Sequence, residues 1–237
     1  MSNKIRIRNR AWFKYPWASL WMRLAGISRF GRFAMRMAGL FAPPYKARRY
    51  LAKLGRKGYI APSATIHCGN LSLGSNVFLG ERVTIYANDK NCRVVIGTRS
   101  SLHQDCLIET GKGGNLKIGE DTHIQPRCQF SAYVGSINIG NGVQIAPNCA
   151  FYPYDHGFLP SGTISKQPLK TKGGIIIEDD VWLSFGVMVL DGVRIGKGAV
   201  IGAGSLVTRD VPEGAIATGM PARIIMNREQ LGNAVHD

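Results

Sequence analysis

The chain has 237 residues, with 30 Lys or Arg against 15 Asp or Glu, and therefore a formal net charge of +15. This length fits one large domain or one domain with an appendage. Charged residues interrupt every apolar run near the start of the sequence, so we expect neither a secretory signal peptide nor a membrane-spanning segment. The five cysteines include no CxxC pair, which argues against a disulfide framework or a zinc knuckle and favours small buried thiols in a cytoplasmic protein.

The charge is concentrated at the start of the sequence. Residues 1–60 contain 15 of the 30 basic residues and no acidic residue, whereas residues 61–237 contain 15 of each kind. The first quarter is therefore a basic appendage on a neutral remainder. Such asymmetry points to contact with an anionic partner.

Residues 1–16 are expected to be loose, and residues 17–41 are expected to form a helix. On a helical wheel one side is apolar, with Trp17, Leu20, Trp21, Leu24, Ile27 and Met35. The opposite side is basic, with Arg29, Arg32 and Arg36. An interfacial membrane helix needs these two faces, so we expect residues 1–42 to bind an anionic membrane reversibly. The alternatives are packing on the end of the repeats or on a neighbouring subunit, nucleic-acid binding, and a cleaved organellar transit peptide.

Pro43 and Pro44 end this element, because proline cannot continue a helix, and residues 45–57 are expected to form a short basic helix. A different period begins near Ile60. Between residues 174 and 210 an apolar residue recurs every six positions, at Ile177, Leu183, Val189, Ile195, Ile201 and Val207. The same phase occurs earlier, at Leu73, Leu79, Ile85, Ile118, Ile124, Ile139 and Ile145. A helix repeats at 3.6 and a lone strand at 2, so a period of six predicts a β-helix of hexapeptide repeats.

The six-residue phase breaks at residues 87–93 and 110–115, which we interpret as loops. The longest break is polar and rich in turn residues, and loops of this length are usually functional. The predicted organisation is a basic helical extension over residues 1–58, a β-helix domain over 59–225 with an excursion over 151–174, and a frayed tail over 226–237.

One histidine lies at the mouth of the excursion. His156 stands between Asp155 and Gly157, shortly after a coil strand. A histidine in this place can face a cleft and act as a general base at neutral pH, and the alternative is a solvent-exposed loop residue. Stacked coils can align His103 with His123, but no closely spaced pair of histidines fixes two ligands locally, so we expect no metal.

Residues 60–225 resemble the hexapeptide-repeat acyltransferases, most strongly from His156 to Ile225. The stretch DDVWLSFGVMVLDGVRIGKGAVIGAGSLVTRDVPEGAIATGMPARII is similar to the galactoside, maltose and polysaccharide O-acetyltransferase branch. The resemblance implies a mainly β protein whose fold is a left-handed parallel β-helix. It also implies a homotrimer, with acetyl-CoA as co-substrate in the groove between two β-helices.

The resemblance further implies roles for particular residues. His156 matches the family's catalytic histidine, which lies upstream of the DxVW segment. The residues expected to contact acetyl-CoA are Trp182, Phe185, Ala203, Thr208, Arg209 and Arg223. The family's WIG is WLS here, and Phe185 replaces a small residue, which would narrow the cleft. From their places beside the excursion, Asn148, Tyr154 and Asp155 are candidates for the acceptor side.

The predicted function is an acetyl-CoA-dependent O-acetyltransferase that modifies a sugar hydroxyl of a surface polysaccharide or a lipid-linked glycan precursor. Direct transfer in a ternary complex is expected, because no serine or cysteine beside a base suggests an acyl-enzyme. The expected location is cytoplasmic, peripheral at the inner face of the cytoplasmic membrane, and no nucleic acid is expected as partner. The alternatives are a soluble acetyltransferase for a small acceptor (a nucleotide amino sugar, serine or an antibiotic), a non-catalytic scaffold, and a carbonic-anhydrase-like zinc enzyme.

Overall fold

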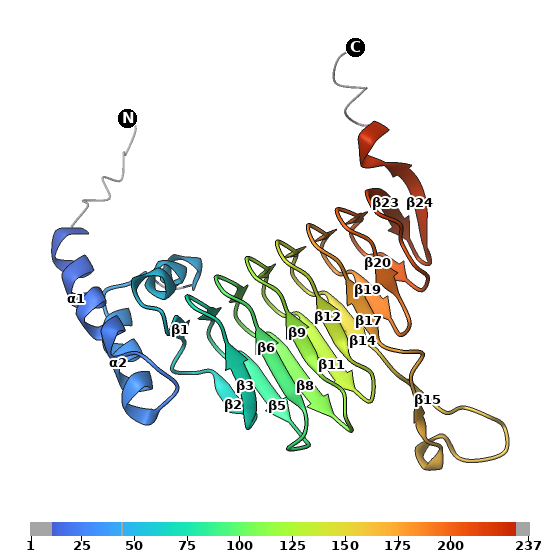
Figure 1. The fold of residues 1–237 in the computed structure, drawn as a ribbon, viewed down its shortest axis with the longest axis horizontal. Helices are drawn as coiled ribbons and strands as arrows, with labels where there is room; N and C mark the ends of the chain where they lie inside the picture. Colours follow the sequence, from blue (N-terminus) through green and yellow to red (C-terminus); the bar gives the residue numbers. More distant parts are fainter. Residues whose placement is uncertain (1–10, 44, 231–237) are drawn as a thin grey trace, which may run out of the picture.

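The computed structural model describes residues 11–43 and 45–230, which form an elongated parallel β-helix with helices at one end (Figure 1). Its nine-stranded sheet consists of β1 (Tyr59–Ile60), β4 (Phe78–Leu79), β7 (Ser101–Leu102), β10 (His123–Ile124), β13 (Gln144–Ile145), β18 (Trp182–Leu183), β21 (Val200–Ile201), β23 (Ala215–Gly219) and β24 (Ala222–Asn227). The seven-stranded sheet consists of β2 (Thr65–His67), β5 (Thr84–Ala87), β8 (Leu107–Gly111), β11 (Gln129–Tyr133), β14 (Ala150–Tyr152), β19 (Met188–Leu190) and β22 (Leu206–Val207). The six-stranded sheet consists of β3 (Asn70–Leu73), β6 (Arg93–Ile96), β9 (Leu116–Ile118), β12 (Ile137–Ile139), β17 (Ile175–Ile177) and β20 (Arg194–Ile195).

The predicted hexad phase is the inward-facing position of these strands. Parallel pairing in the nine-stranded sheet stacks one buried residue per coil: Ile60, Leu79, Leu102, Ile124, Ile145, Leu183, Ile201 and Ala217. The neighbouring residues of the same short strands point outward, because side chains alternate along a strand. The predicted mainly β fold class, a parallel β-helix of hexapeptide repeats with an N-terminal helical extension, is confirmed.

Two corners of the coil differ in how the chain turns. The first corner joins the nine-stranded sheet to the seven-stranded sheet, and in every described coil after the first it contains a residue with positive φ: Arg82, Asp105, Arg127, Asn148, Gly186 and Gly204. Gly and Asn tolerate this left-handed conformation best. The second corner joins the seven-stranded sheet to the six-stranded sheet, and it is the corner at which the chain makes its loops and its long excursion.

The predicted loops lie at the second corner, with shifted bounds. Strand β5 includes Ala87, β6 begins at Arg93, and β8 continues to Gly111, so the predicted loops begin or end inside strands. The excursion begins after Tyr152 rather than at residue 151, because Phe151 is fully buried in the coil.

The C-terminal prediction also needs correction. Strand β24 pairs antiparallel with β23 and continues to Asn227, so the tail does not begin at residue 226. The predictions for residues 1–10 and 231–237 lie outside the described residues.

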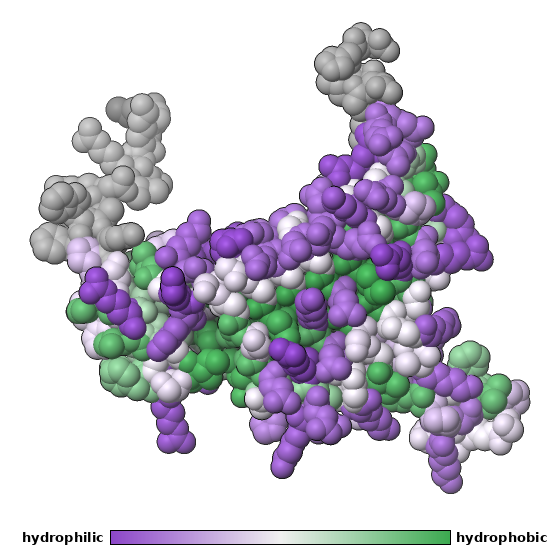
Figure 2. All heavy atoms as spheres, viewed as in Figure 1, coloured by the Kyte–Doolittle hydropathy of each residue, from purple (hydrophilic) through white to green (hydrophobic). Residues whose placement is uncertain are grey.

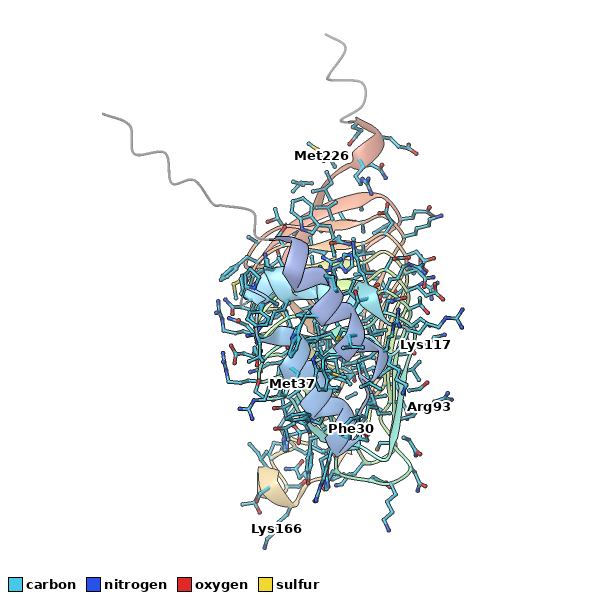
Figure 3. The ribbon with its side chains drawn as sticks, turned by 90° about the vertical axis from the view of Figure 1, so that its left-hand side faces the viewer. Phe30, Met37, Arg93, Lys117, Lys166 and Met226 are labelled. Carbon is cyan, nitrogen blue, oxygen red and sulfur yellow. The ribbon has the colours of Figure 1, made fainter. Side chains whose placement is uncertain are left out.

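The basic extension folds back as a cap on the first coil. It consists of α1 (Ala11–Arg23), α2 (Arg29–Gly39) and the 3-10 helix η1 (Tyr45–Leu54). Its buried side chains join the core of the solenoid: Ala18, Met22, Ala25, Met35, Ala38, Leu51 and Ala52. In Figure 3, α1 and α2 lie across the end of the solenoid that faces the viewer. No helix in the described part of the chain is long and apolar enough to cross a membrane.

The expected single helix over residues 17–41 was wrong. The chain turns between Arg23 and Arg29, and the Ser28 hydroxyl caps α2 by accepting a hydrogen bond from the Gly31 amide at 3.1 Å. The expectation that residues 1–16 are loose was also wrong from Ala11 onward, where α1 begins.

Basic side chains of the extension also make internal contacts. Arg32 donates to the backbone oxygens of Pro62 and Ala64, both at 2.6 Å, and ties α2 to the first coil. Arg49 of η1 reaches the Nε2 atom of His123 at 2.7 Å. The structure therefore shows the packing on the end of the repeats that the sequence offered as an alternative, and only part of the charge of the extension faces solvent.

A buried histidine beneath η1 leads to a prediction about stability. His103 lies against the ring of Phe78, and its Nε2 atom has no hydrogen-bond partner among the described residues. Burial, followed by the charges of Lys46 and Arg49, lowers the pKa of His103 from 6.5 to about 4. The unfolded chain therefore takes up the proton at higher pH than the folded chain, and acid favours unfolding. The contribution of neutral His103 to the free energy of unfolding should be fully present above pH 6.5. The free energy of unfolding should fall by about 3 kcal/mol as the pH drops to 4.

Urea unfolding of the wild type and of His103→Phe at pH 7 and pH 4.5 measures this effect. The variant should lose less stability on acidification than the wild type, because it removes the titrating group and keeps an aromatic ring in the same place. Equal losses in the two proteins would contradict the assignment.

Candidate active site

The excursion projects from the second corner as a two-stranded ribbon (Figure 1). Strand β15 (Asp155–His156) pairs antiparallel with β16 (Leu169–Lys170), and the short 3-10 helix η2 (Ile164–Lys166) lies between them. His156 pairs with Leu169 in this ribbon. The candidate general base is therefore held on paired backbone rather than on an irregular loop.

One buried carboxylate fixes the base of the ribbon. Asp191 is only 6% exposed, and it accepts hydrogen bonds from the Thr171 hydroxyl at 3.0 Å and from the Lys172 and Gly174 amides at 2.5 and 3.1 Å. Gly174 has φ +94°, and a Cβ there would lie 2.2 Å from the Ser136 oxygen, so only glycine fits. Sequence reasoning missed Asp191, although an acidic residue directly after the apolar strand VMVL was a visible signal.

His156 lies at a cavity of about 350 Å³ beside this ribbon. The cavity is lined by Asp155, His156, Gly157, Phe158, Leu159, Lys170, Thr171, Lys172 and Asp191. The His156 side chain is exposed, and it makes no side-chain hydrogen bond within residues 11–43 and 45–230. An accessible imidazole over a cavity with apolar and polar walls is suited to accepting a proton from a bound hydroxyl.

Of the predicted acceptor residues, Tyr154 and Asp155 lie with His156. The Tyr154 ring is 6.4 Å from the His156 ring, and its hydroxyl lies 3.5 Å from the Ser131 Oγ atom. Asp155 is exposed and makes no hydrogen bond to the imidazole. Adjacent residues of an extended chain point in opposite directions, which accounts for the absence of this contact.

Asn148, the third predicted acceptor residue, lies elsewhere. It is at the first corner with φ +62°, and its Oδ1 atom accepts a hydrogen bond from Arg127 Nε at 2.8 Å. Turn geometry explains an asparagine at this position without a ligand. The structure does not bring Asn148 together with His156 in one chain.

The predicted coenzyme residues divide between the two corners. Phe185 and Ala203 follow Asn148 on successive coils of the first corner, as shown by the Gly186 amide donating to Pro147 and the Gly204 amide donating to Phe185. Thr208 and Arg209 are exposed at the second corner, on the coil beyond Asp191.

The first-corner residues can form one half of a coenzyme site. Trp182 and Phe185 are 52% and 53% exposed, although they belong to coils whose other large side chains are mostly buried. Arg223 lies in β24 of the terminal hairpin, which packs on this corner through the Gly219 amide and Ser205 Oγ at 3.1 Å. Exposed aromatic rings and a cation fit the adenine, pantetheine and phosphate groups of a coenzyme A thioester.

Other titratable side chains of the described residues do not form a metal centre. Burial, followed by the Arg49 charge, lowers the pKa of His123, and its ring also contacts the Ser101 hydroxyl at 3.0 Å. Three buried thiols on successive coils donate to backbone carbonyls. The neighbouring thiol, followed by burial, raises the pKa of Cys128 and of Cys149. Within residues 11–43 and 45–230, no group of three His, Cys, Asp or Glu side chains converges as metal ligands.

Comparisons with known proteins agree with this architecture. The family model "Bacterial transferase hexapeptide (six repeats)" matches residues 174–209. A 2,3,4,5-tetrahydropyridine-2,6-dicarboxylate N-acetyltransferase of Staphylococcus aureus is 47% identical over 57 residues, which is 24% of this chain and 24% of that protein. The chain thus matches about a quarter of the length of this curated relative.

Two solved structures share the fold. The polysialic-acid-specific acetyltransferase NeuO is 29% identical with a TM-score of 0.58, and the match covers 69% of this chain and 70% of NeuO. The second is a mutant of AntD, an N-acyltransferase from Bacillus cereus, in complex with dTDP-4-amino-4,6-dideoxyglucose and coenzyme A. It is 21% identical with a TM-score of 0.57, and the match covers 72% of this chain and 91% of AntD. The chain therefore carries the repeat and the fold of the hexapeptide-repeat acyltransferases, as its sequence predicted.

Proposed function

We propose that this chain is an acetyl-CoA-dependent O-acetyltransferase whose acceptor is a sugar hydroxyl of a surface polysaccharide or of a lipid-linked glycan precursor. The observation that carries the proposal is the accessible His156 imidazole at the cavity beside the excursion. Asp191 fixes the place where this excursion rejoins the coil. The match to NeuO over about two thirds of both chains supports a glycan acceptor.

His156 would act as the general base. Its neutral imidazole accepts the proton of the acceptor hydroxyl while the oxygen attacks the thioester carbonyl carbon. The new C–O bond forms, the C–S bond breaks, and the imidazolium returns its proton to the leaving thiolate. Such proton transfer contributes about 10²–10⁴-fold, and alignment of the two substrates supplies much of the remaining rate enhancement.

The division of the site between two corners supports an oligomer. His156, Thr208 and Arg209 lie at the second corner, whereas Trp182 and Phe185 lie at or beside the first corner, and the seven-stranded sheet separates the corners within one chain. Hydrophobic residues also form a band along the coil strands in Figure 2. We therefore propose a closed homotrimer, in which the first corner of one copy meets the second corner of the next and completes each site. Light scattering that finds an active monomer would contradict it.

Trp182 provides a test of the coenzyme half of the site. Trp182→Ala should raise the KM for acetyl-CoA by about tenfold, because stacking on one aromatic ring contributes about 1–3 kcal/mol. The kcat should change little, since this binding is equal in the ground state and the transition state. Phe30→Ala is the matched control, because Phe30 is an aromatic residue of similar exposure but lies in the cap. An unchanged KM for acetyl-CoA would show that Trp182 does not contact the coenzyme.

A second candidate is N-acyl transfer to a small amino acceptor such as a nucleotide amino sugar. It is favoured by the 57-residue match to an N-acetyltransferase and by the shared fold of AntD. Thiol release from acetyl-CoA, measured with soluble glycans and with nucleotide amino sugars in turn, separates the two candidates. Release that depends on a glycan supports the proposal, release that depends on an amino sugar supports the second candidate, and no release with any acceptor supports a scaffold.

A further inference from the structure

The outer face of the helical cap is apolar although it lies at the surface. Large apolar side chains there are 47% to 59% exposed: Leu20, Leu24, Ile27, Phe30, Phe33, Leu40 and Phe41. They come from α1, the turn after it, α2 and the residues that follow α2. We call this set the cap face. Large exposed apolar side chains gathered on two helices that pack together are typical of a binding surface rather than of free solvent exposure.

The cap face shares only Leu20, Leu24 and Ile27 with the apolar face that the helical wheel predicted. Met35 is buried in the core, and Trp17 and Trp21 are half-buried, with ring centroids 5.7 Å apart. The Trp17 Nε1 atom donates to the Met37 oxygen at 2.7 Å. The tryptophans therefore hold α1 against α2, and residues on the outer side of the helices remain to meet a partner.

Exposed basic residues alternate with those of the cap face along the sequence, and the same segment carries no negative charge. Arg23, Arg29 and Arg36 are exposed between its apolar residues in the sequence. No Asp or Glu occurs in residues 1–60. Each such cation contributes about 1 kcal/mol near an anionic membrane surface.

A cationic hollow adjoins the turn between α1 and α2. Its volume is about 480 Å³, and it is lined by Gly26, Ile27, Ser28, Arg56, Lys57, Leu73, Gly74 and Ser75. Lys57 lies directly against the turn, since a Cβ at Gly26 would be 3.8 Å from its Nζ atom. The hollow is thus continuous with the apolar surface at Ile27 and is large enough for a phosphate group.

We propose that the cap face docks on an anionic lipid bilayer. Leu24, Ile27 and Phe30 enter the headgroup region, and the hollow at Arg56 and Lys57 receives a lipid phosphate. An amphipathic surface with this charge binds in the plane of the interface. Membrane binding does not depend on the acyl acceptor. Its biological role rests on the proposed function, because membrane binding would bring the transferase to a lipid-linked glycan.

Charge favours a lipid surface over a second copy of the chain as occupant. Two cap faces brought together would place like-charged arginines opposite each other, with no acidic side chain from either extension to neutralise them. An anionic bilayer offers the complementary charge together with an apolar interior.

Vesicle co-sedimentation tests the proposal with the full chain. Phosphatidylcholine vesicles containing phosphatidylglycerol should bind the wild type at low salt, and added salt should weaken the binding. The triple variant Leu24→Ser, Ile27→Ser, Phe30→Ser should bind about a thousandfold more weakly, because each buried apolar side chain accounts for about tenfold. Arg56→Gln with Lys57→Gln should remove most of the preference for phosphatidylglycerol over pure phosphatidylcholine, by about fivefold for each charge.

A matched control lies at the other end of the solenoid. Ile224→Ser with Ile225→Ser changes side chains of similar exposure and should leave vesicle binding unchanged. The triple cap variant should retain wild-type transfer to a soluble acceptor, so loss of vesicle binding is separable from failure of the proposed function.

Three results would overturn the proposal. The first is that the wild type does not bind vesicles containing phosphatidylglycerol at low salt. The second is that the triple variant and the wild type bind these vesicles equally. The third is concentration-dependent association of the wild type, without vesicle binding, that the triple variant abolishes. That result would make a second copy the occupant.

Discussion

His156→Ala and His156→Asn are both expected to lower kcat by about 10²–10⁴-fold. Neither variant supplies a base of suitable pKa, and asparagine keeps a polar group of similar size. The side chain is exposed and makes no internal hydrogen bond within the described residues, so the melting temperature and the KM for acetyl-CoA should remain near those of the wild type. Steady-state kinetics together with thermal unfolding give all three quantities.

His67→Ala is the matched control for this substitution. His67 is also an exposed histidine on a short strand, but it lies near the start of the solenoid and stacks on Tyr86. Its replacement should leave kcat unchanged. A His156 variant that keeps more than about a tenth of wild-type activity would remove His156 from the role of base.

Phe130→Ala is expected to lower the free energy of unfolding by about 3–5 kcal/mol. Phe130 of β11 and Phe151 of β14 are both fully buried, and their rings stack with centroids 4.6 Å apart and an interplanar angle of 4°. Truncation therefore removes a large buried ring and leaves a cavity within the coils directly below the excursion. Denaturant unfolding measures the loss.

Tyr152→Ala is the control for the core substitution, because Tyr152 neighbours Phe151 on β14 but points outward and is 39% exposed. Its replacement should cost less than about 1 kcal/mol. Similar losses for Phe130→Ala and Tyr152→Ala would contradict the assignment of the hexad phase to the buried column.

The sequence predicted the solenoid well, because its core is a repeating local pattern. An apolar residue at every sixth position needs only the regular geometry of a coil, and residues such as Ile124 and Leu183 are buried as that geometry requires. The period could not distinguish the three faces of the coil, because each face has the same hexad. The separation of Asn148 and Phe185 from His156 therefore became visible only in the folded chain.

Asp191 and the cap show two other limits. The carboxylate of Asp191 acts on Thr171, Lys172 and Gly174, which approach it only when the excursion returns to the coil. The helical wheel assumed one continuous helix, but the turn before the Ser28 cap redirects the chain and exposes a partly different set of side chains. Contacts between residues far apart in the sequence determine both features, so local patterns marked Asp191 as unusual but did not show its partners.

The most direct test of the proposed chemistry is to determine whether the transferred acetyl group is held by an ester or an amide bond. Purified chain, radiolabelled acetyl-CoA and a glycan acceptor should yield labelled glycan whose label is released by mild alkali, because an O-acetyl ester is hydrolysed where an amide is stable. The label should be lost with His156→Asn. Alkali-stable label on an amino sugar, or alkali-labile transfer that is undiminished in His156→Asn, would contradict O-acetyl transfer with His156 as the base.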